Sequence, residues 1–220
     1  MRVRADAPSA ARDAANYVAR VARTAISSRR VFHLAVSGGS TPALMLRALA
    51  SRSVGWASVH VWQVDERVAP DGDDARNAVA LLRVLVARAP IPKANVHLMD
   101  VTARDLAGAA RRYAAVLPAF DLVHLGLGDD GHTASWPPDQ PAVRIAPGLV
   151  TMTATYRGVR RMTLTADALR QARHVLWLVC GSDKRQVLRR VLDGDTTLPA
   201  THAFDERSVC FIDRAADPRS

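Results

Sequence analysis

Three short segments combine charged or hydroxyl side chains with glycine in patterns that suit chemistry. They read Ser-Gly-Gly-Ser-Thr-Pro at 37–42, Asp-Glu-Arg at 65–67 and Gly-Leu-Gly-Asp-Asp-Gly-His-Thr at 126–133. Each follows a run of β-branched and other apolar residues, as expected where a strand ends. Because ligands of open parallel sheets bind beyond the carboxyl ends of the strands, these segments are the first candidates for a functional site.

The segment at 37–42 has the composition of an anion site. Its two glycines let the backbone approach a ligand closely. A helix with Thr41 as N-cap and Pro42 at its first position would add free N–H groups and the positive end of a dipole. A plain glycine-rich turn is the alternative, and a nucleotide P-loop is excluded because its lysine and spacing are absent. We predict phosphate binding by the following residues: Ser37, Gly38, Gly39, Ser40 and Thr41.

The Asp-Glu-Arg triplet at 65–67 recurs at 205–207, which allows an internal comparison. The second copy precedes an apolar run, so we expect it at the opposite edge of the sheet and interpret it as surface charge. In the first copy, Arg67 would supply planar donors for a phosphate or a developing oxyanion. Asp65 would supply a carboxylate that binds sugar hydroxyls or orients a partner.

The third segment places a histidine beside carboxylates. Its Gly-x-Gly-x-x-Gly spacing resembles a dinucleotide site, but two aspartates would repel a pyrophosphate, and no Asp or Glu occurs at 141–166 to bind a ribose. Four of the other six histidines lie in or at apolar strand runs: His33, His60, His124 and His174. Since an imidazole titrates near neutral pH, His132 in its glycine-rich loop is the candidate general base. Asp130 and Asp65 are the next candidates.

The elements that position these loops are readable from hydrophobic periodicity. We predict strands at 31–36, 59–64, 96–99, 122–127, 162–165, 174–180 and 209–212. We predict helices at 8–27, 42–50, 75–89, 103–117 and 183–192. The alternation predicts one Rossmann-like α/β domain over residues 1–220, with a doubly wound, mostly parallel sheet and helices on both faces.

Composition narrows the classes of partner. The chain of 220 residues is 49% hydrophobic, enough for one sizeable core. Its net charge of +9 is spread along the sequence, as in a soluble protein or one that attracts an anionic metabolite. Neither a basic helix nor arginine interleaved with aromatics appears, so we expect a small-molecule partner and no nucleic acid. The sequence leaves the oligomeric state open and is compatible with a monomer.

Signals for a metal, a covalent nucleophile or a membrane segment are missing. No His-Glu-x-x-His, Cys-x-x-Cys or Gly-x-Ser-x-Gly motif occurs, so we expect no metal and water as the nucleophile. Cys180 and Cys210 lie in apolar runs, where reduced thiols behave as small hydrophobic side chains. The first 15 residues lack a signal-peptide core, and no segment approaches the ~18 apolar residues that cross a bilayer. We therefore expect a cytoplasmic protein.

In combination, the motifs resemble the 6-phosphogluconolactonase family. Its members show SGGSTP, VDER with a downstream Asn, GxGxDGHTAS, an RxTLT strand and a GxxK turn. These blocks occur here in the same order over about two thirds of the chain. They are SGGSTP at 37–42, VDER at 64–67 with Asn77, GLGDDGHTAS at 126–135, RMTLT at 161–165 and GSDK at 181–184.

The resemblance implies hydrolysis of 6-phospho-D-glucono-1,5-lactone to 6-phosphogluconate, the second step of the oxidative pentose phosphate pathway, without a cofactor. His132 would activate water, while Arg67 or backbone N–H groups of the glycine-rich loops would stabilise the oxyanion. The phosphate would lie against 37–41 and anchor the lactone for attack. Further substrate contacts are expected from Gly128, Asp130, Arg157 and Lys184.

Three positions depart from the family pattern. Arg76 stands where many members have Ser before the Asn, and Trp136-Pro137-Pro138 replaces a Leu-Phe-Pro-Gly segment. Tyr156-Arg157-Gly158 stands where members carry Lys-Pro-Pro, so Arg157 is the candidate replacement for a lysine near the substrate phosphate.

Two other functions remain as alternatives. Glucosamine-6-phosphate deaminases or isomerases share the GGSTP and DGH elements, but they show DEY in place of 65–67 and Phe-Asn-Glu-Pro in place of 135–138. The missing glutamate argues against deamination. A non-catalytic sugar-phosphate sensor would carry a DNA-binding module, and the ~30 residues before the first predicted strand are too few for a helix-turn-helix domain with its own core.

Overall fold

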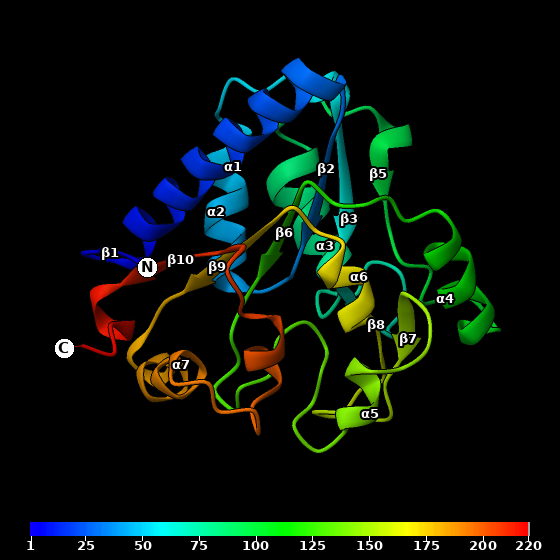
Figure 1. Cartoon of the computed structure of the whole chain (residues 1–220). Coiled ribbons are helices and arrows are strands. Elements are labelled where there is room, and N and C mark those ends of the chain that lie inside the picture. Colours follow the sequence, from blue (N-terminus) through cyan, green and yellow to red (C-terminus); the bar gives the residue numbers. More distant parts are fainter. Residues whose placement is uncertain (220) are drawn as a thin grey trace.

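A seven-stranded parallel sheet lies between two layers of helices (Figure 1). The computed structural model describes residues 1–219. Every strand pair in this sheet is parallel, in the order β1-β10-β9-β6-β2-β3-β5. The strands are β1 (Arg2–Arg4), β2 (Phe32–Val36), β3 (Val59–Gln63), β5 (Val96–His97), β6 (Leu122–Leu125), β9 (His174–Val179) and β10 (Ser208–Asp213).

The strand order confirms the doubly wound topology. From β2 the chain adds β3 and β5 on one side, then returns to add β6, β9 and β10 on the other. The reversal lies between β2 and β6, which pair through Leu34 with Leu122 and Val36 with His124. Ligands of doubly wound sheets bind at this reversal. The glycine-rich loops that follow β2 and β6 therefore leave the sheet at the favoured place for a site.

Helices cover both faces of the sheet. The helix α1, its successor α2 and the pair formed by α3 and a π-helical turn at Leu82–Val86 pack on one face. The helices α4, α6 and α7 pack on the other. Their bounds are α1 (Ala7–Arg29), α2 (Ser40–Ala50), α3 (Asn77–Leu81), α4 (Leu106–Ala115), α5 (Pro141–Arg144), α6 (Ala166–Arg170) and α7 (Arg185–Leu192).

Local sequence explains the longest helix. Asp6 caps α1 by accepting a hydrogen bond from the Ser9 N–H at 2.7 Å, and Arg30 ends it in the left-handed region with φ 66°. Between these ends, buried apolar residues recur at three- and four-residue spacing and form a continuous stripe against the sheet.

A second, three-stranded antiparallel sheet was not predicted. It has the order β4-β8-β7, with β4 (Asp65–Arg67), β8 (Arg161–Leu164) and β7 (Val150–Met152). The segment at 162–165, predicted as a strand of the main sheet, forms β8 here and pairs with β4. A charged triplet has no hydrophobic alternation, so sequence periodicity did not identify β4 as a strand.

The start of α2 also differs from its prediction. The helix begins at Ser40 with Gly39 as N-cap, and not at Pro42 with Thr41 as N-cap. Gly39 has φ 120°, a conformation that residues with a Cβ rarely adopt, so the chain turns into the helix two residues earlier than expected. The predicted helix at 75–89 begins at Asn77 and changes to the π-helical turn after Leu81.

The second Asp-Glu-Arg triplet precedes β10 at the amino edge of the sheet, as expected. Its interpretation as surface charge holds for Glu206, which is exposed, but is wrong for Arg207. The Arg207 guanidinium pairs with Asp205 and donates to three backbone carbonyls, those of Leu169, Arg170 and Ala172. This arginine binds carbonyl groups at the end of α6 and just beyond it, where the helix supplies few N–H partners.

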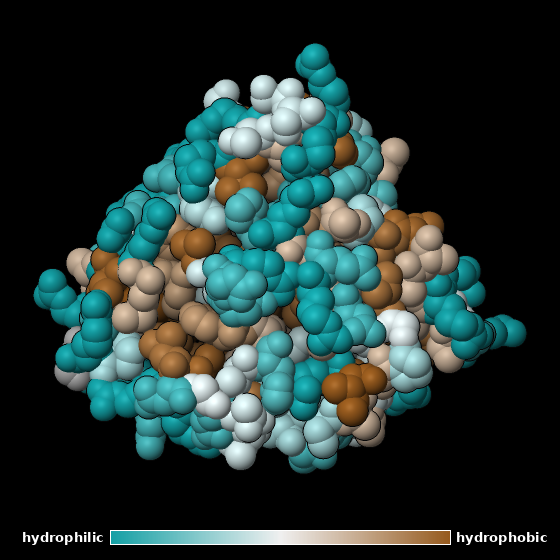
Figure 2. All heavy atoms as spheres, viewed as in Figure 1, coloured by the Kyte–Doolittle hydropathy of each residue, from teal (hydrophilic) through white to brown (hydrophobic). Residues whose placement is uncertain are grey.

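The exposed apolar side chains are scattered. The large ones lie on separate elements, and Figure 2 shows hydrophobic residues of one face as separate patches among hydrophilic ones. Within residues 1–219, no helix has the length and apolar character needed to cross a bilayer.

Candidate active site

A cavity of about 260 Å³ opens at the carboxyl edge of the main sheet, where the three loops meet. Eleven of the twelve residues predicted for the site line it: Ser37, Gly38, Gly39, Ser40, Thr41, Asp65, Arg67, Gly128, His132, Arg157 and Lys184. The twelfth, Asp130, lies behind His132 and contacts its ring. Segments far apart in the sequence thus form one site.

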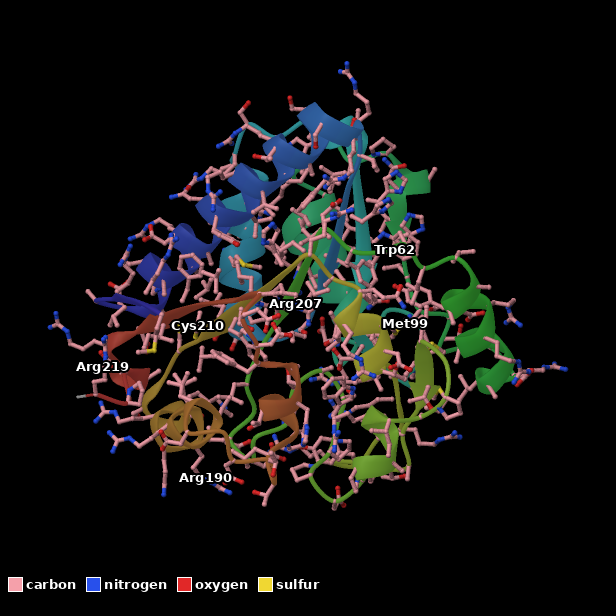
Figure 3. The ribbon with its side chains drawn as sticks, in the orientation of Figure 1. Trp62, Met99, Arg190, Arg207, Cys210 and Arg219 are labelled. Atoms are coloured by element: carbon pink, nitrogen blue, oxygen red, sulfur yellow. The ribbon has the colours of Figure 1, made fainter. Side chains whose placement is uncertain are left out.

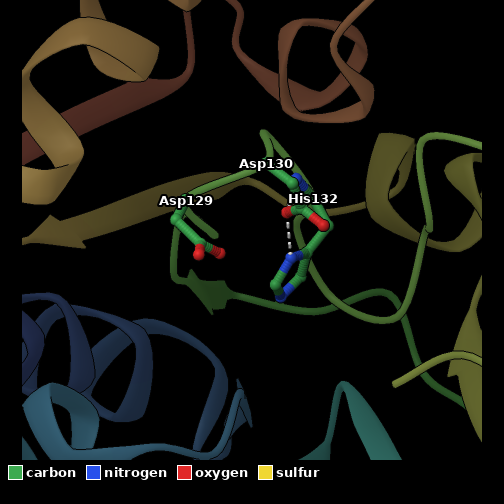
Figure 4. A group of neighbouring side chains, drawn as sticks. All are labelled: Asp129, Asp130 and His132. Carbon is green, nitrogen blue, oxygen red and sulfur yellow. Dashed lines mark hydrogen bonds and ion pairs between the residues drawn. The ribbon is translucent and has the colours of Figure 1, made fainter. Parts of the chain in front are cut away.

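The His132 ring is oriented by Asp130. Their Nδ1 and Oδ1 atoms lie 2.5 Å apart, and Figure 4 shows the other ring nitrogen directed away from this contact. Because an ionised carboxylate only accepts hydrogen bonds, Nδ1 carries the proton in the neutral form of the ring and Nε2 then has the lone pair. The Tyr156 hydroxyl donates to the second oxygen of Asp130 and lies 3.0 Å from His132 Nδ1. Tyr156, Asp130 and His132 therefore form one connected group.

The electrostatics of this group keep Asp130 negative. Burial acts to raise the pKa of Asp130, but hydrogen bonds from His132 and Tyr156 outweigh it and lower the pKa well below its usual range. Burial and the bond to Asp130 raise the pKa of Tyr156, so the phenol keeps its proton. A fixed negative charge at Nδ1 stabilises the imidazolium that forms when Nε2 accepts a proton.

The backbone of the histidine loop makes room for the ring. The Gly128 N–H donates to the His132 carbonyl at 2.8 Å, and the Thr133 hydroxyl donates to the Gly126 carbonyl at 2.9 Å. A Cβ on Gly128 would lie 2.0 Å from His132 Nδ1, which no side chain can tolerate. Glycine at this position is thus required for the imidazole to lie against the loop.

The two-residue period of β4 divides the Asp-Glu-Arg triplet between two faces. Asp65 and Arg67 point to the cavity, whereas the completely buried Glu66 points away from it. The antiparallel register places Arg67 beside Arg161 of β8. Asp65 accepts a hydrogen bond from the Ser135 hydroxyl at 2.6 Å, and burial raises its pKa despite that bond.

Arg161 is a second cationic residue at this end of the cavity. It is 7% exposed, and its Nε has no hydrogen-bond partner among residues 1–219. Burial lowers the pKa of Arg161 in spite of the nearby Asp65. A buried guanidinium at the wall of a cavity suits an anionic ligand.

Glu66 connects the second loop to the start of α3. Its carboxylate accepts from the backbone N–H groups of Arg67, Asn77 and Ala78 and from the Gln63 amide, at 2.7–2.8 Å. Two of these donors belong to the first turn of α3, so the carboxylate also stabilises that helix end. The Asn77 side chain donates to the Asp65 carbonyl at 2.9 Å.

The Asn77 side chain also lies against Gly38. A Cβ on Gly38 would lie 1.9 Å from Asn77 Oδ1. The close approach that sequence suggested for a ligand is thus made, at this glycine, by a neighbouring side chain. α2 has no side-chain N-cap, so the N–H groups of its first turn are left for a ligand in the cavity.

The remaining cations of the cavity are partly paired. Lys184 Nζ lies 3.0 Å from Asp183, and Arg157 contacts Asp129 at 2.5 Å and Asp130 at 3.3 Å. Four cationic side chains line the cavity against the carboxylates of Asp65 and Asp129. The excess of positive charge favours an anionic ligand.

A metal site and a thiol nucleophile receive little support. Asp129, Asp130 and His132 offer ligand atoms within 4.8 Å of one another, but these carboxylates already bind Arg157, which a cation would have to displace. Burial raises the pKa of Cys180, which lines the cavity, to about 12, so its thiol stays protonated.

Four residues that line or support the cavity were not assigned a role from the sequence: Asn77, Ser135, Tyr156 and Arg161. Three of them belong to the recognisable motifs, as the Asn after VDER, the Ser of GHTAS and the first Arg of RMTLT. Tyr156 lies in the segment 156–158, which departs from the family pattern, and there only Arg157 was given a role. The Tyr156 hydroxyl reaches Asp130 across 26 positions of sequence, a contact that only the fold brings about.

The fold and the site define a doubly wound α/β protein with an oriented histidine at a cationic cavity. The chain belongs to the family described as glucosamine-6-phosphate isomerases/6-phosphogluconolactonase, whose model matches residues 5–211. A 6-phosphogluconolactonase of Synechocystis is 38% identical over 179 residues, covering 76% of this chain and 74% of the relative.

Solved structures agree with this placement. The crystal structure of a 6-phosphogluconolactonase from Thermotoga maritima matches with a TM-score of 0.87 at 29% identity, covering 96% of this chain and 98% of that one. A monomeric glucosamine-6-phosphate deaminase also matches, with a TM-score of 0.83 at 17% identity over 98% of both chains. The fold is therefore common to both activities, and the residues of the site must distinguish them.

Proposed function

We propose that the protein hydrolyses 6-phospho-D-glucono-1,5-lactone to 6-phospho-D-gluconate, the second step of the oxidative pentose phosphate pathway. The observation that carries the proposal is the His132 ring, whose Nδ1 is bonded to an ionised Asp130 while Nε2 has no partner among residues 1–219 and lies at a cationic cavity. The lactonase relatives support the substrate. A lactone needs only a base for water and a site for the oxyanion.

In the proposed mechanism, His132 Nε2 takes a proton from water as the oxygen attacks the lactone carbonyl carbon. The tetrahedral oxyanion is stabilised by Arg67 or Arg161, which lie side by side on β4 and β8. Collapse of the intermediate breaks the bond to the ring oxygen, and the imidazolium returns its proton to that oxygen. Asp130 stabilises the imidazolium meanwhile, and Tyr156 holds Asp130 in place.

The substrate phosphate is assigned to the first loop. The uncapped start of α2 and the hydroxyls of Ser37, Ser40 and Thr41 line one part of the cavity, and Lys184 adds a positive charge. Arg157 adds positive charge to the cavity, but its guanidinium is already paired with Asp129 and Asp130. Anchoring the phosphate positions the carbonyl group for attack.

The deaminase alternative lacks a necessary group. Where the deaminase motif carries its glutamate, this chain has Trp136 and two prolines. Trp136 is buried and donates its indole N–H to the Leu164 carbonyl at 2.7 Å, so the segment packs into the core. Deamination and isomerisation need more acid–base groups than His132 and Asp130 provide.

A coupled assay with freshly generated 6-phosphogluconolactone tests the proposal directly. The spontaneous opening of the lactone is measured without protein and subtracted. We expect turnover that persists in EDTA, and no ammonia release from glucosamine 6-phosphate. Ammonia release without lactonase activity would overturn the assignment, and loss in EDTA restored by one metal would overturn the metal-free mechanism.

The phosphate assignment has its own test in Gly38→Ala. The new Cβ would collide with the Asn77 side chain and force it and the first loop apart, and we expect KM for the lactone to rise by about tenfold, or ~1.4 kcal/mol. Gly126→Ala is the matched control, because a Cβ there meets no atom within 4 Å. Equal KM values in the two folded variants would remove the phosphate from this loop.

A further inference from the structure

A second cationic cavity, of about 280 Å³, lies at the amino edge of the main sheet. Arg20 and Arg29 of α1 line it together with Asp121, Arg173 and His174, which lie at the starts of β6 and β9. Residues at the opposite ends of the same two strands line the catalytic cavity. With ~3.3 Å per residue, strands of this length separate the two cavities by roughly 13–20 Å.

The positive charge of this cavity, hereafter the amino-edge cavity, is only partly neutralised. Its single carboxylate, Asp121, is 3% exposed and has both oxygens engaged, one by Arg29 and the other by the His33 backbone N–H at 2.8 Å. Arg173 Nε lies 3.8 Å from Asp121, beyond hydrogen-bonding distance. Arg173 is therefore left with donors that Asp121 does not use.

Arg20 has no carboxylate partner within residues 1–219. Its guanidinium lies over the Tyr17 ring, 4.9 Å from the centroid, which fixes the side chain without neutralising it. Three guanidinium groups thus face one carboxylate across the cavity. A net charge of about +2 at one small concave surface matches a dianion.

The pKa of His174 responds to the positive electrostatic potential inside the cavity. Its half-buried ring packs edge-on against Tyr17, with 6.4 Å between ring centroids. Burial lowers the pKa of His174, and the charges of Arg20, Arg173 and Arg29 lower it further, with only Asp121 acting in the opposite direction. The imidazole is accordingly neutral near pH 7 and available as a further donor.

We propose that the amino-edge cavity binds a phosphate dianion, either free or as the phosphate group of a small ester. Arginine forks suit the geometry of phosphate oxygens, and two uncompensated cations match its charge. The cavity shares no residue with the catalytic one, so both can be occupied at once. Such a ligand would join the end of α1 to the starts of β6 and β9.

NMR titration of the His174 ring protons tests the proposal, with His174→Gln used to assign the resonances. The probes are inorganic phosphate and glycerol phosphate, each compared with sodium chloride at equal ionic strength. We expect a saturable shift and an upward move of the His174 titration midpoint, because a bound anion stabilises the imidazolium. A response to both probes assigns the site to phosphate groups in general, and a response to inorganic phosphate alone assigns it to the free ion.

Variants connect the response to the cavity. Arg20→Gln/Arg173→Gln should weaken phosphate binding at least tenfold while leaving lactone turnover unchanged. Arg47→Gln/Arg104→Gln removes the same charge from exposed positions outside both cavities and should bind as the wild type does. If chloride reproduces the His174 response, or if both double variants weaken it equally, the proposal is wrong and the effect is general screening.

Discussion

The two Asp-Glu-Arg triplets have identical residues but differ in backbone conformation, in burial and in the contacts of their side chains. At 65–67 the triplet is a strand at the carboxyl edge of the sheet, and at 205–207 it is a bend and turn at the amino edge. In the strand, Asp65 and Arg67 face the cavity while Glu66 is buried behind them. In the turn, Arg207 folds back on Asp205, and Glu206 extends into solvent.

The comparison shows that backbone conformation, and not residue type, distributes the roles within a triplet. A strand separates neighbours onto opposite faces, whereas a turn brings residues two apart into contact. Figure 3 shows Arg207 among the central elements, with Arg190 and Arg219 at the periphery. Arg207 thus stabilises the fold, whereas Arg67 donates to the Ala75 carbonyl through one nitrogen and keeps its other donors for a ligand.

The largest expected effect concerns the histidine at the carboxyl edge. His132→Gln removes the proposed base, and kcat should fall by about 10²- to 10⁴-fold with KM little changed, because the phosphate contacts lie in another loop. Lactone hydrolysis above the spontaneous rate measures this. His202→Gln, at an exposed histidine, is the control and should be active. A near-normal kcat in His132→Gln would transfer the role of base to Asp130 or Asp65.

Replacing the arginine of each triplet separates catalysis from stability. Arg67→Ala removes a proposed oxyanion donor and should lower kcat/KM by about 10²-fold. Arg207→Ala removes donors to three carbonyls and should lower the free energy of unfolding by about 2 kcal/mol with kcat/KM unchanged. Kinetics and urea unfolding of both variants measure this. If both variants lose mainly kcat/KM, or both lose mainly free energy of unfolding, the two arginines do not have the different roles inferred here.

The glutamates give a pure stability contrast. Glu66→Gln places an amide donor among four N–H donors in a site with no solvent exposure, and it should lower the free energy of unfolding by about 2 kcal/mol. Glu206→Gln alters an exposed side chain and should stay within ~0.5 kcal/mol of the wild type. Equal losses in urea unfolding would mean that Glu66 is not the anchor that its contacts indicate.

The smallest expected effect concerns His124, which lies in β6, eight residues before His132. Burial lowers the pKa of His124 to about 3, and neither ring nitrogen has a hydrogen-bond partner within residues 1–219. The unfolded chain, with a histidine pKa of ~6.5, therefore binds more protons at pH 6 than the folded one, and stability falls as pH drops below ~6.5.

This histidine should contribute about 0.7 kcal/mol of the stability lost between pH 7 and pH 6. His124→Leu should reduce the loss by that amount, as measured by urea unfolding at both pH values. The residual pH dependence then belongs to other histidines with lowered pKa values, such as His97, whose pKa burial lowers to about 4. An unchanged difference in His124→Leu would show that this residue does not carry the effect.

Several features of the fold and the site were predictable from the sequence. Strands buried on both faces, such as β6, read as apolar runs, and helices such as α1 read as periodic ones. The sheet topology then made the loops after β2, β3 and β6 converge. All three line the cavity with residues that sequence analysis had selected.

Contacts between distant segments were decided only by the tertiary structure. β4 is a strand because β8 pairs with it, and Asp130 is held by Tyr156, which lies 26 positions away in the sequence. The hydrogen bonds of Arg207 likewise join it to carbonyls 35–38 positions earlier in the chain. The early start of α2 depends on the backbone conformation at Gly39, which residue types do not reveal. Periodicity records how each segment meets the core, but a short polar segment has no periodicity, so its partners determine its structure.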